Sequence, residues 1–400
     1  MRFSQASTPQ TPRMPVTSKG GRAILTTLLR GGATSRVELA ARLGLSQPAV
    51  TRSTRTLIEA GYLAETEAVP VPGGRGRPTS SLTVAPDRLS FLGVKVTTEE
   101  VIGAAVDLTG QIRAAERTAL TATTPEQVVG AIASLTSELG HTPGLGPVTA
   151  LGVGVTGDVD SITGTARRAP LMGWAGVPLG RLVAEASGLA TVVDNDVRAL
   201  TRAEWWYGAG RGVGSFALVT VGAGVGCGLF LNGSIYEGAH GVTGELGHLP
   251  LDERALSCAC GASGCVETAA STAAILRDLR AIDGLSAITL AEATELAAAG
   301  NQPVLAVFDR VGTVLGRALA CVANLVGPDR IILSGEGIAL FDLYRERLRQ
   351  TMTAHAFGAA LCEIVPLPLP FEQWARAAAV TAMETFVTGG KKKGQADAAS

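Results

Sequence analysis

One histidine and three cysteines stand at a spacing typical of a metal site. His248 is followed by the run Cys258-x-Cys260-x4-Cys265. An imidazole and three thiolates complete a tetrahedron, and soft ligands of this kind suit zinc. Because four protein ligands leave no open position for an activated water, we expect a structural Zn²⁺ held by His248, Cys258, Cys260 and Cys265. The alternative is a set of buried free thiols beside an unrelated histidine.

Acidic and amide side chains stand where a strand should end and a helix should begin. The apolar run 191–193 leads directly into Asp194, Asn195 and Asp196, and helix-forming sequence continues to Trp206. Ligands of α/β proteins commonly bind at the carboxyl ends of strands, so Asp196 is well placed for chemistry. Its alternative role is to cap the helix.

The N-terminal segment has the helix spacing of a DNA-binding module. An apolar helix over 23–29 precedes a second helix capped by Ser35 and a third capped by Ser46, with Gly44 in the turn between them. This spacing predicts a helix-turn-helix, whose third helix enters the major groove. We expect that helix to contact DNA through Ser46, Gln47, Thr51, Arg52 and Arg55.

A basic, glycine-rich loop follows this module. Residues 73–78 read Gly-Gly-Arg-Gly-Arg-Pro and precede a strand over 81–84, which predicts a β-hairpin wing. Arg75 and Arg77 on such a tip can enter a narrow minor groove. Residues 1–90 hold 12 Lys/Arg against 5 Asp/Glu, whereas the rest of the chain holds 22 against 30. This asymmetry favours DNA as the partner of the N-terminal module alone; a solvated loop or a protein-contact module is the alternative.

The rest of the chain repeats one pattern. Three strands over 89–119 precede a helix over 125–139, and the same plan starts again at Phe216. Two related α/β domains that face each other across a ligand cleft would explain this repeat. The uncharged run 212–236 is long enough to span a membrane, but its glycines favour two buried strands joined by turns, so we expect no membrane partner. Without a secretory signal, the six cysteines indicate reduced thiols in a cytoplasm.

Four stretches resemble the ROK family of repressors and sugar kinases in order and spacing. They are Asp194-Asn195-Asp196, Gly222-Ala-Gly-Val-Gly-Cys-Gly228, Gly244-Glu-Leu-Gly-His248 and the run from Cys258 to Glu267. The resemblance covers nearly the whole chain, and the winged helix is similar to that of the repressor branch, which includes xylose- and N-acetylglucosamine-responsive repressors. It implies an α/β fold class: an N-terminal winged helix-turn-helix plus a two-domain actin-like ATPase (ribonuclease H-like) sugar-kinase fold.

The expected domain boundaries follow from the module and the resemblance together. We expect a disordered tail over 1–19, a winged helix-turn-helix DNA-binding domain over 20–86, a first α/β domain over 87–198 plus 371–388, a second α/β domain with the zinc site over 199–370, and a disordered tail over 389–400.

The resemblance also implies a sugar site and the same four metal ligands. The matching sugar-binding positions are Asn195, Asp196, Glu245, His248 and Glu267. With one ring nitrogen of His248 on zinc, the other would be fixed as a donor to a sugar hydroxyl. In a kinase, Asp196 would be the catalytic general base that accepts the hydroxyl proton.

The kinase pattern is broken at the positions that would bind nucleotide. Family kinases carry an Asp followed by Gly-Gly-Thr after the first strand, where this chain has Gly93-Val-Lys95-Val-Thr-Thr98. Ala223 stands where the family usually has Thr, and 334–337 is only an approximate nucleotide-side turn. We therefore do not expect ATP as a cofactor. Because Lys95 could itself attract a phosphate, an ATP-dependent hexose kinase that also binds DNA stays open as the alternative.

These features predict a sugar-responsive DNA-binding transcriptional regulator, a repressor of genes for carbohydrate uptake or metabolism. It is expected to act on a palindromic operator as a homodimer or higher homo-oligomer. A transport protein is a possible further partner. The sugar stays open among deoxy sugars, pentoses, amino sugars and phosphorylated sugars, as does the direction of its effect on DNA binding.

Overall fold

A computed structural model describes residues 14, 18–66, 80–239, 241–358 and 362–390 of the chain. It divides into two compact units, which are treated separately below. Unit 1 consists of residues 1–207 and 371–400, and unit 2 of residues 208–370. The expected tails and the wing tip with Arg75 and Arg77 lie largely outside the described residues.

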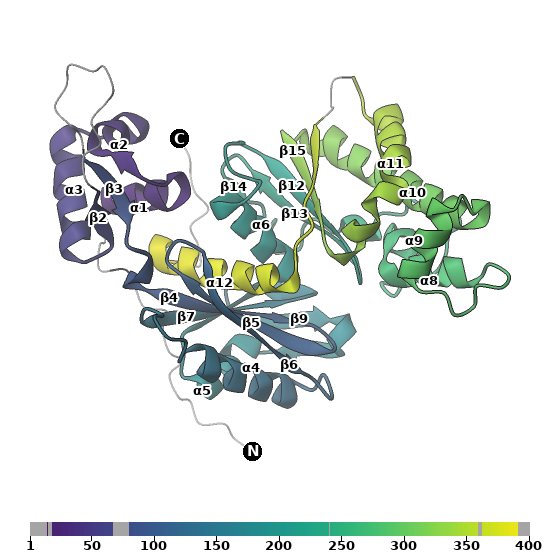
Figure 1. Cartoon of the computed structure of the whole chain (residues 1–400), viewed down its shortest axis with the longest axis horizontal. Coiled ribbons are helices and arrows are strands. Elements are labelled where there is room, and N and C mark those ends of the chain that lie inside the picture. The colour runs from purple at the N-terminus through teal and green to yellow at the C-terminus, as the bar shows by residue number, and fades with distance from the viewer. Residues whose placement is uncertain (1–13, 15–17, 67–79, 240, 359–361, 391–400) are drawn as a thin grey trace. The chain divides into compact units, whose positions relative to one another are not determined.

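The N-terminal module of unit 1 is a winged helix-turn-helix (Figure 1). Ser35 and Ser46 cap the second and third helices through their side-chain oxygens, and Gly44 lies between those helices in the left-handed conformation, as the sequence predicts. The three short strands pair in the order β1-β3-β2. The elements are α1 (Lys19–Gly31), β1 (Thr34–Ser35), α2 (Arg36–Leu43), α3 (Gln47–Glu59), β2 (Leu63–Glu65) and β3 (Ser81–Val84).

The rest of unit 1 is built on a five-stranded sheet of order β11-β7-β4-β5-β6. Strands β4, β5 and β6 form the antiparallel meander expected from the sequence, and β7 and β11 add parallel to β4. The elements are β4 (Ser90–Val96), β5 (Glu100–Asp107), β6 (Ile112–Ala119), α4 (Pro125–Leu139), β7 (Val148–Val155), α5 (Leu179–Ser187), β11 (Thr191–Asn195), α6 (Asp196–Tyr207) and α12 (Phe371–Thr388). A second antiparallel sheet, not predicted from the sequence, contains β8 (Asp158–Asp160), β9 (Thr165–Ala169) and β10 (Trp174–Val177).

Two helices pack on the face of the sheet opposite α4. Helix α12 lies along β4 and β7 (Figure 1), and its backbone comes so close that side chains cannot fit between them. A Cβ at Gly93 would lie 1.9 Å from the Ala375 carbonyl oxygen, and one at Gly152 would lie 1.8 Å from that of Ala378. Helix α6 packs beside α12, so two glycines in the sheet fix the position of this helical layer.

The winged helix-turn-helix module rests on the same helical layer. Helix α1 contacts both α12 and α6. The Arg22 guanidinium donates to the Thr388 carbonyl at 2.9 Å, and the Arg30 guanidinium lies 4.0 Å from the ring centroid of Trp205 in α6. Cation–π contacts of this kind hold an arginine in place without neutralising it.

Unit 2 repeats the strand plan of unit 1. Its sheet has the order β14-β13-β12-β15-β16, in which β12, β13 and β14 form an antiparallel meander and β15 and β16 add parallel to β12. The elements are β12 (Phe216–Val221), β13 (Val225–Leu231), β14 (Ser234–Ile235), α7 (Glu267–Ala270), α8 (Thr272–Arg280), α9 (Leu290–Ala298), α10 (Gln302–Val326), β15 (Arg330–Ser334), α11 (Phe341–His355) and β16 (Glu363–Pro366). The uncharged run 212–236 thus forms strands, as expected.

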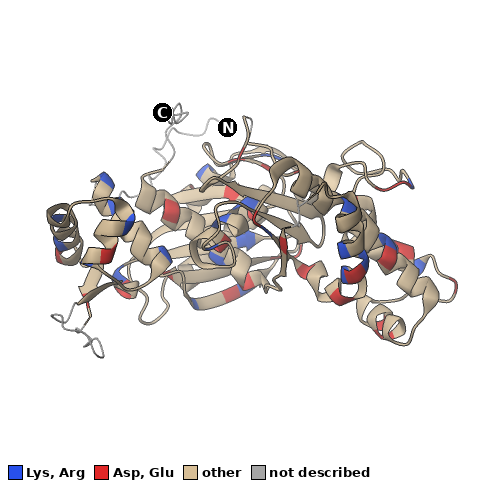
Figure 2. Cartoon of the chain, turned by 90° about the horizontal axis from the view of Figure 1, so that it is seen from above, with Lys and Arg blue, Asp and Glu red and all other residues tan. Residues whose placement is uncertain are grey.

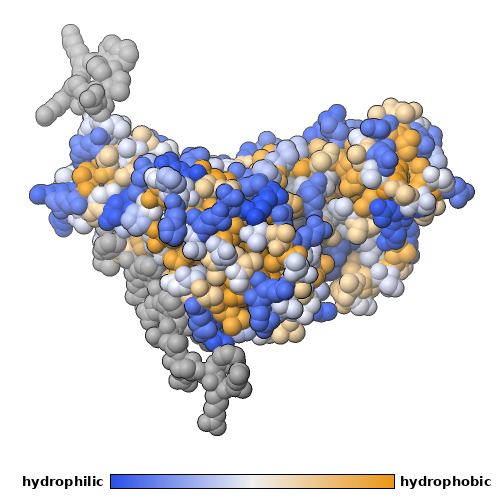
Figure 3. Space-filling model, turned by 60° about the horizontal axis from the view of Figure 1, so that its bottom comes forward, coloured by the Kyte–Doolittle hydropathy of each residue, from blue (hydrophilic) through white to orange (hydrophobic). Residues whose placement is uncertain are grey.

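Each unit has its own hydrophobic core. In unit 1 the core lies between the sheet and helices α4 and α5; in unit 2 it lies between the sheet and α10. Figure 3 shows polar and apolar residues interspersed on the face that it presents. Across the described part of the chain, no helix combines the length and apolar character needed to cross a bilayer.

Candidate functional site

The histidine and three cysteines predicted as metal ligands come together in unit 2. His248 ends a short 3-10 helix (Leu246–His248), and its Nδ1 lies 3.7 Å from the Cys258 sulfur. The sulfurs of Cys260 and Cys265 are also 3.7 Å apart, and all four ligand atoms lie within 4.8 Å of one another. Sulfurs bound tetrahedrally at about 2.3 Å would be about 3.8 Å apart. The four side chains therefore form a cluster that fits a tetrahedral metal ion.

Tight turns in the loop bring the cysteines to this point. The Cys258 amide donates to the Ala262 carbonyl at 2.8 Å, and Cys265 pairs with Pro250 in an isolated β-bridge. Burial raises the pKa of the Cys265 thiol. A metal that binds there must therefore displace a proton from a group that would otherwise stay neutral, which couples metal binding to pH.

Three predicted sugar positions lie in unit 2, and one of them, His248, belongs to this cluster. Because Nδ1 of His248 faces the sulfurs, its Nε2 points away from them and lies 3.9 Å from Oε2 of Glu245. Glu267 starts α7, and its Oε2 accepts a hydrogen bond from the Val225 amide at 3.2 Å. Whichever ion the cluster holds, coordination through Nδ1 would fix the direction of Nε2, and the role of this nitrogen toward a sugar stays a prediction.

The two other predicted sugar positions, Asn195 and Asp196, lie in unit 1 where β11 meets α6. Asp196 is buried, and its Oδ2 accepts hydrogen bonds from the Lys95 ammonium and from the Thr156 hydroxyl, the latter at 2.7 Å. Its Oδ1 accepts from the Val197 amide at 2.9 Å. Lys95 is itself only 5% exposed, so the ion pair is buried on both sides.

The sheet register explains how Lys95 reaches this carboxylate. Lys95 on β4 and Asp194 on β11 are both paired with Gly154 of the strand between them, β7. A Cβ at Gly154 would lie 3.6 Å from the Cα of Asp196, so this position of the middle strand is close to the carboxylate residue and has room for no more than a small side chain. Lys95 also lies 5.3 Å from the ring centroid of Trp374, which forms one wall of its site.

The electrostatic surroundings of Asp196 make it a poor general base. Burial acts to raise the pKa of Asp196, but the Lys95 charge, together with the hydrogen bonds from Lys95, Thr156 and Val197, outweighs burial and holds the pKa below its usual range. A catalytic base has to accept the hydroxyl proton as the reaction proceeds. A carboxylate whose charged form is stabilised in this way accepts that proton less readily.

A network of buried charges fixes the first residues of α6. Asp194 accepts from Arg198 Nε at 2.7 Å and from Arg202 Nη1 at 3.0 Å, and Arg202 also pairs with Glu384 of α12. Sequence reasoning missed this network, although Arg198 and Arg202 stand four and eight residues after Asp194 on one helix face. It ties the β11–α6 junction to the C-terminal helix α12.

Asn195, rather than Asp196, caps α6. Its Oδ1 accepts from the Arg198 amide at 3.1 Å, and its Nδ2 donates to the Gly157 carbonyl at 3.0 Å. The side chain is half-buried and fixed in orientation by these two bonds. Any contact that it makes with a ligand would therefore use its remaining donor and acceptor capacity.

The predicted DNA-contacting side chains of α3 share one exposed face. Val50, Thr54 and Leu57 are buried on the inner side of the helix. The side chains expected to meet DNA are exposed: Ser46, Gln47, Thr51, Arg52 and Arg55. Figure 2 shows Lys and Arg residues interspersed with Asp and Glu residues on the helices of this module, and Arg55 pairs with Glu59 at 2.8 Å.

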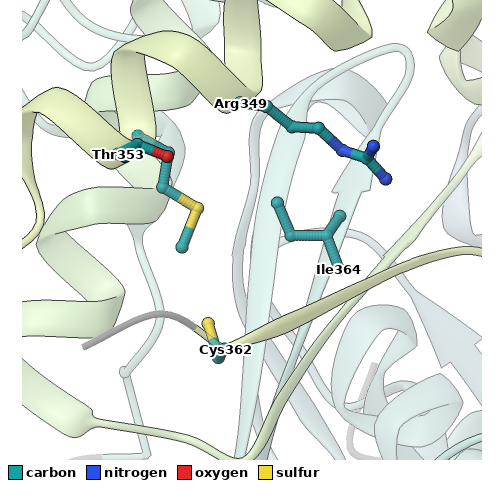
Figure 4. Close-up of a pocket in the computed structure, with 5 residues that line it drawn as sticks. Arg349, Thr353, Cys362 and Ile364 are labelled. Atoms are coloured by element: carbon teal, nitrogen blue, oxygen red, sulfur yellow. The ribbon is translucent and has the colours of Figure 1, made fainter. Parts of the chain in front are cut away.

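A depression elsewhere in unit 2 is separate from these residues. It is lined by Arg349, Met352, Thr353, Cys362 and Ile364, between α11 and β16 (Figure 4). Cys362 directly precedes β16 and so lies at the amino end of this strand, whereas the 222–224 turn follows the carboxyl end of β12. Because β12, β15 and β16 run parallel, their amino ends lie on one side of the sheet and their carboxyl ends on the other. The depression lies at the amino ends of these strands and the turn at their carboxyl ends.

Comparison with known proteins matches both parts of the chain. The ROK family model matches residues 91–374, and a winged helix-turn-helix DNA-binding model matches residues 21–64. A glucokinase of Halalkalibacterium halodurans is 31% identical over 54% of this chain and 70% of its own length. A putative xylose repressor of a Caldicellulosiruptor species is 26% identical over 84% of this chain and 87% of its own length.

A solved structure also matches both the winged helix and the rest of the chain. A ROK family transcriptional regulator, a homolog of the E. coli Mlc protein, superposes with a TM-score of 0.80 at 25% sequence identity. The match covers 92% of this chain and 97% of that one, so it includes both the winged helix and the two units.

Proposed function

The chain belongs to the ROK family, and we propose that it is a sugar-responsive transcriptional regulator that represses genes for carbohydrate uptake or metabolism. The observation that carries this proposal is the union of two parts in one chain. A winged helix with an exposed polar and basic face precedes a ROK body in which one histidine and three cysteines cluster beside residues that we match to sugar-binding positions by sequence. The similar putative xylose repressor and the superposed ROK family transcriptional regulator carry regulator names, which supports the same role here.

Helix α6 provides a physical route from sugar to DNA within unit 1. Its first residue is Asp196, a proposed sugar ligand, and near its other end Trp205 holds Arg30 of the DNA-binding module. A ligand that shifts the start of this helix also shifts the surface on which α1 rests. Such a ligand regulates DNA binding only to the extent that it binds two arrangements of the helix with different affinity.

We propose that the bound metal is zinc and that its role is structural. The donor set of three thiolates and one imidazole suits this ion, and four protein ligands leave no position for a reactive water. His248 would hold the ion through Nδ1 and offer Nε2 to a sugar hydroxyl, next to Glu245. The ion itself takes part in no chemical step.

The proposed assembly follows from the DNA that such a module reads. A homodimer on a palindromic operator places two recognition helices in successive major grooves, and we propose this state for the chain. We propose Gln47, Thr51, Arg52 and Arg55 as groove contacts and Arg75 and Arg77, which lie outside the described residues, as wing contacts. A cytoplasmic location and a transport-protein partner also belong to this proposal.

The decisive experiment separates DNA binding from sugar sensing. Fluorescence anisotropy would measure binding of the full-length protein to DNA from its own upstream region, with and without a panel of sugars. One sugar should change the Kd by about fivefold or more, the scale of an allosteric coupling. Arg52→Ala should weaken DNA binding and leave sugar binding intact. Glu245→Gln should weaken sugar binding and leave DNA binding intact. Absence of DNA binding by the wild type even at low salt would refute the proposal.

Sugar kinase activity is the second candidate, because the glucokinase relative is 31% identical and the acidic position Asp196 is retained. The Lys95 pair argues against it, since the carboxylate is already occupied by a cation. ADP release in the presence of candidate sugars distinguishes the two functions: turnover would make the chain an enzyme, and its absence across the panel would remove this candidate.

A further inference from the structure

Two turns of unit 2 lie side by side because the strands before them are neighbours. Strands β12 and β15 run parallel, with Thr220 paired to Ser334, so the residues after each strand emerge at the same edge of the sheet. Gly335 has a φ of 96°, and a Cβ there would lie 2.4 Å from the Val221 carbonyl oxygen. Only glycine allows the second turn to press so closely against the first.

The carboxylate of Glu336 occupies the first of these turns. Its Oε1 accepts a hydrogen bond from the Ala223 amide at 2.5 Å. The contact is close along the whole carboxyl group, since a Cβ at Gly222 would lie 2.2 Å from Glu336 Cδ. Consecutive backbone N–H groups of a glycine-rich turn are donors for anions, and a carboxylate competes with a phosphate for the same donors. The turn is therefore able to bind an anion, and in this structure the bound anion is the Glu336 carboxylate of the same chain.

The neighbouring amides are also satisfied from within unit 2. The Gly222 amide donates to the Gly224 carbonyl at 2.9 Å, and the Val225 amide donates to Glu267 at 3.2 Å. Two carboxylates thus face one short stretch of backbone. A polyphosphate that approached it would have to break the Glu336 hydrogen bond and would meet like charge from both side chains.

We propose that Glu336 is a specificity-determining residue, an internal carboxylate that closes the 222–224 turn to nucleoside triphosphates and other polyphosphates. The inference deepens the proposed function and rests on it, because a sensor that reports sugar occupancy without phosphoryl transfer needs a body that does not respond to ATP. It assigns that exclusion to one side chain, in addition to the loss of the glycines after the first strand.

The test measures polyphosphate binding by the full-length, metal-loaded protein. Titration calorimetry with Mg·ATP and with magnesium tripolyphosphate would compare the wild type with Glu336→Ala, which opens the turn, and Glu336→Gln, which keeps the size but removes the charge. Glu346→Ala is the matched control. Glu346 is an exposed glutamate of α11 that accepts a hydrogen bond from Gln350, so its replacement removes the same charge at a distance from the turn. In Glu336→Ala a polyphosphate no longer has to displace one charge-assisted hydrogen bond. We therefore expect this variant to bind Mg·ATP and magnesium tripolyphosphate at least about tenfold more tightly than the wild type does.

The possible outcomes separate cleanly. Tighter binding by Glu336→Ala, a smaller gain for Glu336→Gln and no gain for Glu346→Ala support the inference. It is overturned if the wild type binds Mg·ATP as tightly as Glu336→Ala, if the control gains equally, or if the two Glu336 variants unfold at the wild-type temperature yet bind no better. Operator binding measured on the same samples is a separate readout, since its absence in the wild type refutes the proposed function and leaves the polyphosphate result standing.

Discussion

Replacing Lys95 by methionine should cost unit 1 much of its stability at neutral pH. The change removes the ammonium from Asp196 but keeps a side chain of similar length, so a buried carboxylate is left with only its hydrogen bonds to Thr156 and Val197. Breaking a buried ion pair from one side typically costs about 3–5 kcal/mol, because the remaining charge stays desolvated. Replacing both partners in Lys95→Met/Asp196→Leu should restore stability to within about 1 kcal/mol of the wild type.

The stability difference between Lys95→Met and the wild type should depend on pH in a definite direction. In the wild type the pKa of Asp196 lies below 3.8, its ordinary value, so the pair stabilises the fold above that pH and the contribution is lost as the pH falls through the lowered pKa. In Lys95→Met, burial acts without the opposing cation, and the pKa of Asp196 should rise above 3.8. The stability difference between the two proteins should therefore be largest near neutrality and should narrow as the pH falls towards 3.8.

Tryptophan fluorescence during urea unfolding measures this difference selectively. All four tryptophans, Trp174, Trp205, Trp206 and Trp374, belong to unit 1. Arg55→Met is the matched control, because its exposed pair with Glu59 should contribute no more than about 0.5 kcal/mol. Equal stability of Lys95→Met and wild type at pH 7, or a gap that does not narrow in acid, would refute the account of a buried charge pair.

Three further outcomes are expected. Metal analysis of the purified protein should give about one zinc per chain, and Cys265→Ser should abolish it and lower the unfolding temperature of unit 2; a folded, zinc-free wild type would contradict this. Arg52→Ala should weaken operator binding and reduce the salt dependence of log Kd by about one unit if this side chain meets a phosphate, whereas an unchanged affinity and slope would remove it from the interface. Gly152→Ala should destabilise unit 1 by about 1–3 kcal/mol or more in urea, because the new methyl group meets the Ala378 carbonyl, while the same change at exposed Gly130 should not.

Local patterns in the sequence predicted the elements and the metal cluster well. The helix over 125–139 has the predicted bounds and the second strand plan starts at Phe216 as predicted, because turns and polar residues end each apolar run sharply. Ser35 and Ser46 cap helices as expected, since an N-cap depends only on residues three positions away. The predicted metal ligands meet because three of them lie within one short loop.

What the sequence did not predict depends on contacts between distant residues. The Lys95–Asp196 pair depends on the order of three strands, in which Lys95 and Asp194 both pair with Gly154, and this order cannot be read from residues near Lys95. The Glu336 contact likewise requires β12 and β15 to be neighbours. The β8–β10 sheet was missed because its strands are short and carry no regular alternation of apolar residues.

The position of α12 also sets the order in which the protein can be completed during synthesis. Its backbone seals the glycine-bearing strands β4 and β7 and supports α1 through the Arg22–Thr388 contact, yet the whole of unit 2 is translated between α6 and α12. At typical elongation rates this takes on the order of ten seconds or more. A nascent or truncated chain that lacks α12 would thus keep the contact of α1 with α6 but lose its contact with α12, because the Arg22–Thr388 hydrogen bond forms only after residue 388 has been synthesised.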